Sequence, residues 1–415
     1  MDIEIITIGD ELLIGQVVDT NSAWIGREVN KIGFRVVRRT AVGDDEEDIL
    51  AALEAASRRA PVVLLTGGLG PTKDDITLRT LCRYFDCRLH FSDEVMANIE
   101  QLFGRSGRAM NELTRNQAMV PDKATVIQNR VGTAPCTWFE RDGLTLVSMP
   151  GVPSEMKWLM SNEIIPRLHN HFRQDTFIKH RSYRISDFTE SALASYIAGF
   201  EDNMPSGIKL AYLPQAGSIV LRLSAYSDSE TACNEAMTLV CRQLETCLQG
   251  HIISDDDSPL EAVVGRMLKS AGATVATAES CTGGAIAAAL TSVAGSSSYF
   301  LGSIIAYSNT VKMNTLYIYP ATLKAFGAVS KEVVEEMAMG ALQAIGSDYA
   351  IATSGIAGPS GGTPLKPVGT VWISVASRRK VVSKEFHFAG EREHVIRRAV
   401  NSGLLMLCNA VRETL

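Results

Sequence analysis

Apolar runs and amphipathic stretches alternate along the first 168 residues of the chain. Short runs that are almost wholly apolar are typical of strands buried on both faces, whereas apolar positions three or four apart indicate helices. The expected strands are residues 3–9, 34–42 and 61–68, and the expected helices are residues 20–32 and 45–60. This β-α-β-α-β order predicts a parallel, doubly wound sheet over residues 1–168.

The pattern changes twice further along the chain. Residues 169–253 carry two expected strands (180–186, 218–227) and two expected helices (189–200, 229–248), which predicts a small α+β domain. An acidic turn with a proline, residues 254–259, is a candidate linker. Residues 257–415 return to strand–helix alternation, with expected helices at 259–272, 281–293, 330–346 and 391–415 and expected strands at 273–280, 299–308, 348–358 and 369–377. The predicted fold class is therefore α/β, with two doubly wound α/β domains joined by a small α+β domain.

Composition narrows the class of protein. A chain of 415 residues is too long for one ordinary hydrophobic core, so more than one domain is expected. The net charge of −6 and the lack of a long basic run do not favour DNA binding. The eight cysteines include no Cys-x-x-Cys pair, so we expect reduced thiols in a cytoplasmic protein and no structural metal. The first residues lack the basic start of a signal peptide, and no apolar stretch reaches the roughly 18 residues of a membrane span.

Three strand-to-helix turns of the first domain carry glycines and acids. Asp10 and Glu11 follow the first strand, and Asp19 opens the next helix. The second turn reads TGGLGPTKDDIT (66–77) and the third SMPGVPSEM (148–156). Their glycines would let backbone amides approach an anion, and paired acids can hold a divalent ion. The alternative is that the glycines only reverse the chain and the acids only cap helices.

The stretch AESCTGG, residues 278–284, raises a second question. Ser280 is either the N-cap of the expected helix at 281–293 or a nucleophile beside an anion site. Glycines inside a helix cost about 1 kcal/mol each relative to alanine, so Gly283 and Gly284 favour a bound ligand. No histidine lies nearby in the sequence as a base, but Lys312, with Tyr307 before it, follows an expected strand. A lysine can act as a base if burial lowers its pKa, although most lysines lie on the surface.

A second glycine-rich segment, ATSGIAGPSGGTPLKPVGTV (352–371), joins two expected strands of this domain. It contains Ser354 and Gly355, and it is either a flexible loop or a loop that wraps a phosphate or a planar ring. Arg392 and Arg397 stand at the start of the last helix, where they either bind a phosphate or form a solvated face.

The long motifs TIGDELLIGQVVDTN, TGGLGPTKDD, NRVGTAPC and PGVPSEM closely resemble the CinA (competence/damage-inducible) family, whose first domain is related to molybdopterin-binding domains. The resemblance implies ADP-ribose pyrophosphatase activity that needs a divalent metal, magnesium or cobalt, and potassium. It assigns phosphate or nucleotide binding to Gly67, Gly68, Gly70, Thr72 and Ser154. It assigns the metal to Asp75, with Asp74, Asp10, Glu11, Asp19, Asp44 and Glu155 as further candidates.

AESCTGG, AYSNTVK, the segment 352–371 and GEREHVIRRAV resemble the C-terminal CinA domain, which also occurs alone as nicotinamide mononucleotide deamidase. The resemblance implies hydrolysis of the carboxamide of nicotinamide mononucleotide without a cofactor. It assigns Ser280 as the nucleophile and Lys312 as its base, with Tyr307 assisting. Substrate binding is expected from Cys281, Thr282, Gly283, Gly284, Ser354, Gly355, Arg392 and Arg397. Ser354 stands where many relatives carry threonine, and the phosphate-binding arginine is either Arg392 or Arg397.

Three alternatives remain open at this point. The first domain could bind its ligand without catalysis, the chain could be a non-catalytic scaffold for competence or DNA repair, or Cys281 could replace Ser280 as nucleophile. The middle domain resembles the KH-type insert of the family, but it has no Gly-x-x-Gly loop between residues 185 and 210, so RNA binding is not expected. The expected partners are nicotinamide mononucleotide, ADP-ribose and a second copy of the chain, with no membrane.

Overall fold

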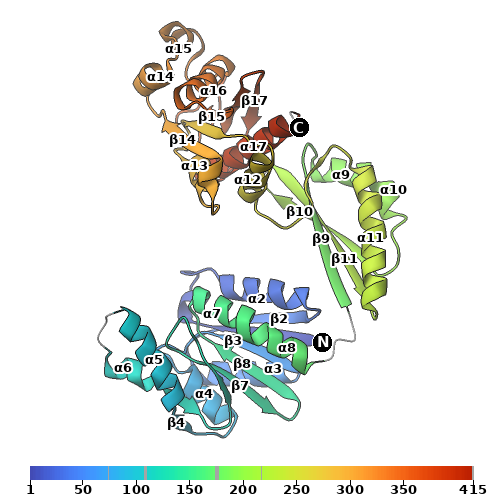
Figure 1. Cartoon of the computed structure of the whole chain (residues 1–415), viewed down its shortest axis with the longest axis vertical. Coiled ribbons are helices and arrows are strands. Elements are labelled where there is room, and N and C mark those ends of the chain that lie inside the picture. The colour runs from blue at the N-terminus through green and yellow to red at the C-terminus, as the bar shows by residue number, and fades with distance from the viewer. Residues whose placement is uncertain (73, 107–109, 173–176, 216, 414–415) are drawn as a thin grey trace. The chain divides into compact units, whose positions relative to one another are not determined.

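The computed structural model describes residues 1–72, 74–106, 110–172, 177–215 and 217–413. The chain divides into two compact units, Met1–His180 with Ser224–Met237, and Arg181–Leu223 with Thr238–Leu415. Two α/β sheets, with a small four-stranded sheet between them in the sequence, confirm the predicted fold class (Figure 1).

The first sheet has six strands in the order β2-β1-β3-β8-β7-β6. Its strands are β1 (Asp2–Ile8), β2 (Arg35–Val42), β3 (Val62–Thr66), β6 (Thr125–Ile127), β7 (Cys136–Arg141) and β8 (Leu144–Met149). Its helices are α1 (Asp10–Leu13), α2 (Thr20–Lys31), α3 (Glu46–Ser57), α4 (Thr77–Tyr84), α5 (Asp93–Ser106), α6 (Glu112–Asn116), α7 (Pro153–Leu159) and α8 (Ile165–His171), with a π-helical turn at Met160–Ile164. A separate strand pair joins β4 (Leu89–Phe91) to β5 (Met119–Pro121).

Four strands of this sheet run parallel, as expected, and their side chains divide between two cores. α2 and α7 pack with Ile3 and Ile5 of β1 on one face, whereas α3 and α4 pack with Ile6 and Ile8 on the other. Successive strand residues point to opposite faces, so an almost wholly apolar strand supplies both cores. β7 pairs antiparallel with β8 and β6 pairs antiparallel with β7, and β8 follows β7 through a tight connection that needs no crossover helix.

The middle sheet has the order β10-β11-β9-β12 and the antiparallel pairing of β12 with β9. Its elements are β9 (Phe177–Ile185), α9 (Glu190–Tyr196), α10 (Ala198–Glu201), β10 (Ile208–Gln215), β11 (Ser218–Ser227), α11 (Glu230–Cys247) and β12 (Ile252–Ser254). The sequence pattern missed β10, whose side chains are mostly half-buried or exposed, and the three-residue β12.

The last sheet has the order β14-β13-β15-β16-β17, with β14, β13 and β15 parallel, β16 antiparallel to β15, and β17 antiparallel to β16. Its elements are α12 (Leu260–Ser270), β13 (Val275–Glu279), α13 (Ala285–Thr291), β14 (Phe300–Ile305), α14 (Asn309–Leu316), α15 (Pro320–Phe326), α16 (Lys331–Ile345), β15 (Tyr349–Gly355), β16 (Thr370–Ser377), β17 (Val381–His387) and α17 (Arg392–Arg412). A 3-10 turn, Ser296–Ser298, precedes β14.

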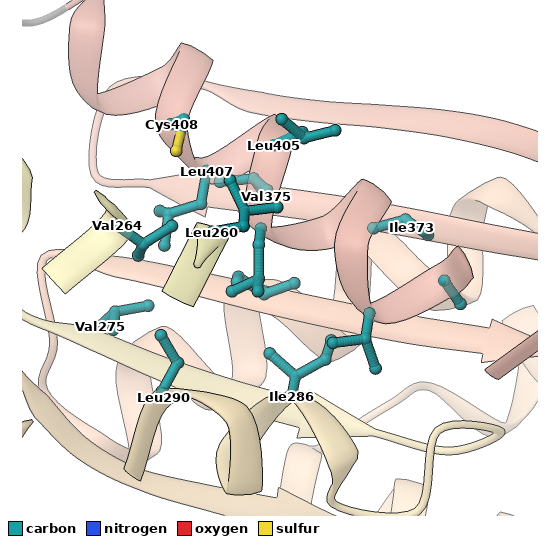
Figure 2. Close-up of a cluster of buried hydrophobic side chains, with 14 of the residues drawn as sticks. Leu260, Val264, Val275, Ile286, Leu290, Ile373, Val375, Leu405, Leu407 and Cys408 are labelled. Carbon is teal, nitrogen blue, oxygen red and sulfur yellow. The ribbon is translucent and has the colours of Figure 1, made fainter. Parts of the chain in front are cut away.

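Two apolar layers enclose the last sheet. α12, α13 and α17 pack on one face through side chains such as Val264, Leu290 and Leu407 (Figure 2). On the other face α16 covers small strand residues, including Ala350 and Ala352. The sheet is therefore fixed on both sides, and the loops at the carboxyl ends of its parallel strands are free to carry a site.

The sequence pattern placed one helix of this domain too early. The helix expected from Cys281 begins at Ala285, because Gly283 and Gly284 have φ angles of +63° and +99°. This left-handed conformation interrupts a right-handed helix and favours glycine. The short α14 and α15 and the edge strand β17 were also missed, since half-exposed elements carry a weak periodic signal.

Candidate active site

Ser280 lies in the turn between β13 and α13. Its backbone N–H donates to the carbonyl oxygen of Thr353 at 3.0 Å, which ties the turn to the end of β15. The N-cap of α13 is Gly284, four residues further on, so the interpretation of Ser280 as the helix cap is wrong. Its hydroxyl is therefore available for another role.

Lys312 of α14 reaches this hydroxyl. Its side chain is only 1% exposed, and its Nζ lies 3.0 Å from Ser280 Oγ. The same nitrogen donates to the carbonyl oxygens of Ala306, at 2.7 Å, and Tyr307, at 3.3 Å. The Ser308 hydroxyl accepts from the Val311 N–H and thereby caps α14, which sets where Lys312 enters the site.

Burial lowers the pKa of Lys312 from its ordinary value of 10.5. Desolvation disfavours the ammonium form, because a charge loses the solvation of water when it is buried. A neutral amine has two N–H groups and one lone pair. In the neutral form the N–H groups can donate to Ala306 and Tyr307 while the lone pair faces the Ser280 hydroxyl.

Cys281, the rival nucleophile, belongs to the hydrophobic core of the domain. Burial raises the pKa of its thiol to about 12. A thiol must ionise to act as a nucleophile, so this environment keeps Cys281 unreactive. The geometry favours Ser280.

Arg392 contacts Tyr307, the residue whose backbone carbonyl accepts from Lys312 Nζ. Arg392 donates through Nη2 to the Tyr307 hydroxyl at 3.2 Å and through Nη1 to the carbonyl oxygen of Gly358 at 2.9 Å. Gly358 belongs to the glycine-rich segment, so the guanidinium joins that segment to Tyr307. Arg397 is exposed one and a half turns along α17, and no such contact is seen for it in the described structure. Of the two arginines, the structure brings Arg392 to the site.

The remaining predicted residues of this site line the same turn and the end of β15. Ser354 is buried and donates its hydroxyl to the Ala328 carbonyl at 2.6 Å, while Gly355 packs where a Cβ would collide with Thr370 and Val371. Thr282 is buried too, and its hydroxyl donates to the Glu279 carboxylate at 2.7 Å. These contacts give Ser354 and Thr282 positions in the framework of the site.

Two backbone amides beside Ser280 are free for a developing oxyanion. The Gly283 N–H already donates to the Ser280 carbonyl at 3.2 Å, and the Gly284 N–H donates to Glu279 at 3.0 Å. Within the described parts of the chain, the N–H groups of Cys281 and Thr282 donate to no acceptor on another residue, and that of Cys281 meets only its own sulfur, a weak acceptor. Unpaired amides next to a nucleophile are the donors that an acyl-transfer site needs.

In the first domain, the three predicted turns meet at one end of the sheet. Asn21 donates to the Gly151 carbonyl at 2.7 Å, and the Thr66 hydroxyl donates to the Pro150 carbonyl at 2.8 Å. A cavity of about 630 Å³ is lined by Gly68, Gly70, Thr72 and Asp75 together with Arg79, and a smaller one of about 120 Å³ by Glu11, Asp19, Asn21 and Gly151. Asn21 and Arg79 were not among the predicted site residues.

The predicted metal ligands are only partly gathered there. The backbone N–H groups of Asp10 and Asp44 donate to each other's carboxylates at 3.1 and 3.2 Å. Burial raises the pKa of Asp44, and the negative charges of Asp10, Glu11 and Asp75 raise it further. Asp75, however, accepts from Gly70 and Thr72 of its own turn.

No group of three or more His, Cys, Asp or Glu side chains in the described ranges is arranged to hold a metal ion. Asp19 accepts from Ser22 at the start of α2, and Glu155 accepts from Asn129 at 2.7 Å while burial raises its pKa. Gly67 is closely packed on Ile8, and Asp74 and Ser154 are exposed. In the described ranges these carboxylates are therefore not gathered as a ready-made divalent-cation site, and no chemical step is assigned to a metal here.

Three family models match the chain in succession. They are described as "Probable molybdopterin binding domain" over residues 4–170, "Damage-inducible protein CinA KH domain" over residues 180–254 and "CinA C-terminal domain" over residues 257–411. Each matches a region with its own sheet in the structure.

Relatives match over nearly the full length. A CinA-like protein of Cytophaga hutchinsonii is 43% identical across 99% of this chain and 97% of its own, and one of Flavobacterium psychrophilum is 42% identical across 98% of each. The crystal structure of the competence/damage inducible protein CihA of Agrobacterium tumefaciens, 38% identical, covers 37% of this chain and 93% of its own with a TM-score of 0.36. None of the helices in the described ranges has both the length and the hydrophobicity to cross a membrane.

Proposed function

Because the chain belongs to the CinA family, we propose that its C-terminal domain hydrolyses nicotinamide mononucleotide to nicotinate mononucleotide and ammonia. The contact that carries the proposal is the 3.0 Å approach of the buried Lys312 amine to the Ser280 hydroxyl. Such a pair can activate a serine without histidine or metal, because a neutral amine accepts the hydroxyl proton. The substrate itself follows from the motif resemblance.

The proposed reaction begins with proton transfer. Neutral Lys312 takes the Ser280 proton while Oγ attacks the carboxamide carbon, and the negative charge that forms on the carbonyl oxygen faces the free amides of Cys281 and Thr282. The lysine ammonium then has three N–H groups for the three oxygens around it. It gives one proton to the amide nitrogen as the C–N bond breaks, so ammonia leaves and an ester on Ser280 remains.

Water then hydrolyses the ester on Ser280, with Lys312 again accepting and returning a proton. Lys312, neutral again, takes a proton from a water molecule that attacks the ester carbon. When the second tetrahedral intermediate collapses, the C–O bond to Ser280 breaks and the proton returns from Lys312 to Oγ. Nicotinate mononucleotide is released and the enzyme regains its first state.

Arg392 is the proposed phosphate-binding residue. Its guanidinium lies with the Tyr307 hydroxyl and the glycine-rich segment, and a guanidinium can donate two parallel hydrogen bonds to a phosphate. Its present contacts with Tyr307 and Gly358 hold it in place for an incoming dianion. Tyr307, 62% exposed, would then border the ribose and phosphate of the substrate.

Release of ammonia from nicotinamide mononucleotide tests the proposal. Purified full-length protein should produce ammonia and nicotinate mononucleotide in equal amounts, with and without a chelator. Ser280→Ala should reduce the rate to background. Full activity in Ser280→Ala would exclude the mechanism.

A second candidate function belongs to the first domain, for which the 630 Å³ cavity beside Gly68, Gly70 and Thr72 is the supporting observation. We propose ADP-ribose as its ligand and pyrophosphate cleavage as its reaction, with magnesium or cobalt and potassium supplied in solution. The competing proposal is ligand binding without turnover. Binding of ADP-ribose measured calorimetrically, together with AMP formation in the presence and absence of these ions, separates the two. We further propose that the protein is cytoplasmic and forms a homodimer. Light scattering, which gives the mass of the protein in solution, tests the dimer.

A further inference from the structure

Glu279, the residue before the proposed nucleophile, has an unusual environment. Its side chain is 0% exposed, and its carboxylate accepts five hydrogen bonds from uncharged groups. Three come from the backbone N–H groups of Gly284 (3.0 Å), Ile286 (3.1 Å) and Ala287 (2.8 Å), and two from the hydroxyls of Thr277 (3.2 Å) and Thr282 (2.7 Å).

These bonds replace a missing helix cap. Gly284 occupies the N-cap of α13 and has no side chain to accept the first N–H groups of the helix. The Glu279 carboxylate accepts them instead, from the other end of the turn. Helix N-termini also favour negative charge, so the placement suits a carboxylate.

The turn held in this way is the one that carries Ser280. Between β13 and α13 the backbone contributes few bonds of its own, chiefly Gly283 N–H to Ser280 O at 3.2 Å and Ala285 N–H to Thr282 O at 3.0 Å. Gly283 and Gly284 are the most permissive residues for backbone rotation. Glu279 therefore restrains a turn that would otherwise be poorly fixed.

We infer that Glu279 is a positioning residue of the amidase site: its carboxylate fixes the turn so that Ser280 Oγ stays in reach of Lys312 and the Cys281 and Thr282 amides face the same point. The inference rests on the proposed function of Ser280. It assigns a role in catalysis to a residue that touches neither the substrate nor the reacting atoms.

Glu279→Gln is the sharpest perturbation. Glutamine has the same shape but one of its two terminal groups is an NH2 donor, and on both carboxylate oxygens at least one partner is a backbone N–H that can only donate. Either orientation of the amide therefore sets donor against donor, and the turn must shift. Glu336→Gln is the matched control, because Glu336 likewise accepts from a backbone N–H, that of Tyr319, and a hydroxyl, that of Thr322, at the start of α15.

The experiment measures kcat and KM for nicotinamide mononucleotide in full-length wild type, Glu279→Gln and Glu336→Gln, with thermal unfolding of each. Misplacing a reacting atom by about 1 Å can cost about 100-fold in rate, so we expect kcat of Glu279→Gln to fall about 10- to 100-fold. KM should change by less than about threefold, because Arg392, the proposed phosphate-binding residue, lies outside this turn. Glu336→Gln should keep the wild-type kcat whatever its unfolding temperature.

A second measurement does not need the substrate. A fluorophosphonate probe forms a bond between phosphorus and a reactive serine oxygen with loss of fluoride, and mass spectrometry locates the adduct. Glu279→Gln should label at Ser280 at least about tenfold more slowly than wild type, in line with the loss of kcat. If the wild-type protein labels at Ser280 but does not hydrolyse the nucleotide, the proposed substrate is wrong. The labelling rate of Glu279→Gln relative to wild type then decides by itself whether Glu279 positions Ser280.

If Glu279→Gln does not fold, Thr282→Val and Thr282→Ser carry the test. Both change the side chain, but only serine keeps the hydroxyl that donates to Glu279. Thr282→Val should lower kcat and the labelling rate, and Thr282→Ser should restore them. Any of three results would overturn the inference. Folded Glu279→Gln could show the kcat and labelling rate of the wild type, or Thr282→Val and Thr282→Ser could have equal rates. The wild-type protein could also show neither turnover of the nucleotide nor labelling at Ser280.

Discussion

Replacement of Lys312 by methionine tests the centre of the proposed chemistry. Methionine has almost the length and volume of lysine without the amine, so it fills the buried space between α14 and Ser280. It removes the proposed base, whose Nζ lies 3.0 Å from Ser280 Oγ, and changes no other side chain of the site. Lys324→Met is the control, since Lys324 lies exposed in the last turn of α15.

Loss of a positioned general base typically lowers a rate about 100- to 10,000-fold, or about 3–5 kcal/mol in activation free energy. KM should change little, because Lys312 binds the proton and not the phosphate. The folding stability of Lys312→Met has two opposing contributions. The carbonyls of Ala306 and Tyr307 lose one hydrogen bond each, at about 1 kcal/mol per bond, while the desolvated amine is removed.

The balance of these terms depends on pH. Because burial lowers the pKa of Lys312, the unfolded wild type binds more protons than the folded one between the lowered value and 10.5. Wild-type stability therefore rises with pH through that window, and the methionine variant lacks this dependence. The unfolding temperature of Lys312→Met relative to wild type should be highest at neutral pH and should fall as pH rises.

Ammonia release, coupled to a dehydrogenase, gives kcat and KM, and calorimetry at several pH values gives the unfolding temperatures. A Lys312→Met protein within about threefold of the wild-type kcat would refute the assignment, because that is far below the effect of losing a base. Loss of activity in Lys324→Met to the same degree would show that the assay reports something other than this site.

Four further outcomes are expected. The wild-type kcat/KM should rise with pH as Lys312 loses its proton, with a midpoint below 10.5; a kcat/KM that rises nowhere below that pH contradicts this. Arg392→Ala should raise KM for nicotinamide mononucleotide about tenfold or more and leave hydrolysis of the phosphate-free riboside unchanged, whereas Arg397→Ala should affect neither. Cys281→Ala should keep at least about half of the activity, since its thiol is not ionised; inactivity with normal folding would revive the thiol as nucleophile. Leu290→Ala, in the core of Figure 2, should lower the free energy of unfolding in urea by about 2–5 kcal/mol, and a loss below about 1 kcal/mol would mean that this core is loosely packed.

The sequence by itself determined the fold class and the positions of the buried elements. Strands such as Val62–Thr66 and helices such as Lys331–Ile345 have strong apolar patterns because each must bury a face against a neighbour. The long motifs around Ser280 and Gly67 determined the family. Sequence also identified Ser280 and Lys312 as candidates, through residue type and resemblance.

Only the tertiary structure decided which candidates meet. Ser280 and Lys312 are 32 positions apart in the sequence, and the pairing of β13 with β14, followed by α14, brings them to 3.0 Å. Between Arg392 and Arg397 the sequence offered no choice, because both are arginines on one helix. The chain path of the segment around Gly358 determines which of them reaches Tyr307.

Ionisation and capping are likewise tertiary properties. A lysine is exposed or buried according to what packs over it, so the lowered pKa of Lys312 and the raised pKa of Cys281 have no signature in the local sequence. Glu279 reads as an ordinary acid before a serine, and its five donors are gathered only when two glycines turn the chain back over it. Apolar periodicity reports on burial of whole elements, whereas the site depends on distances between individual atoms that long-range packing sets.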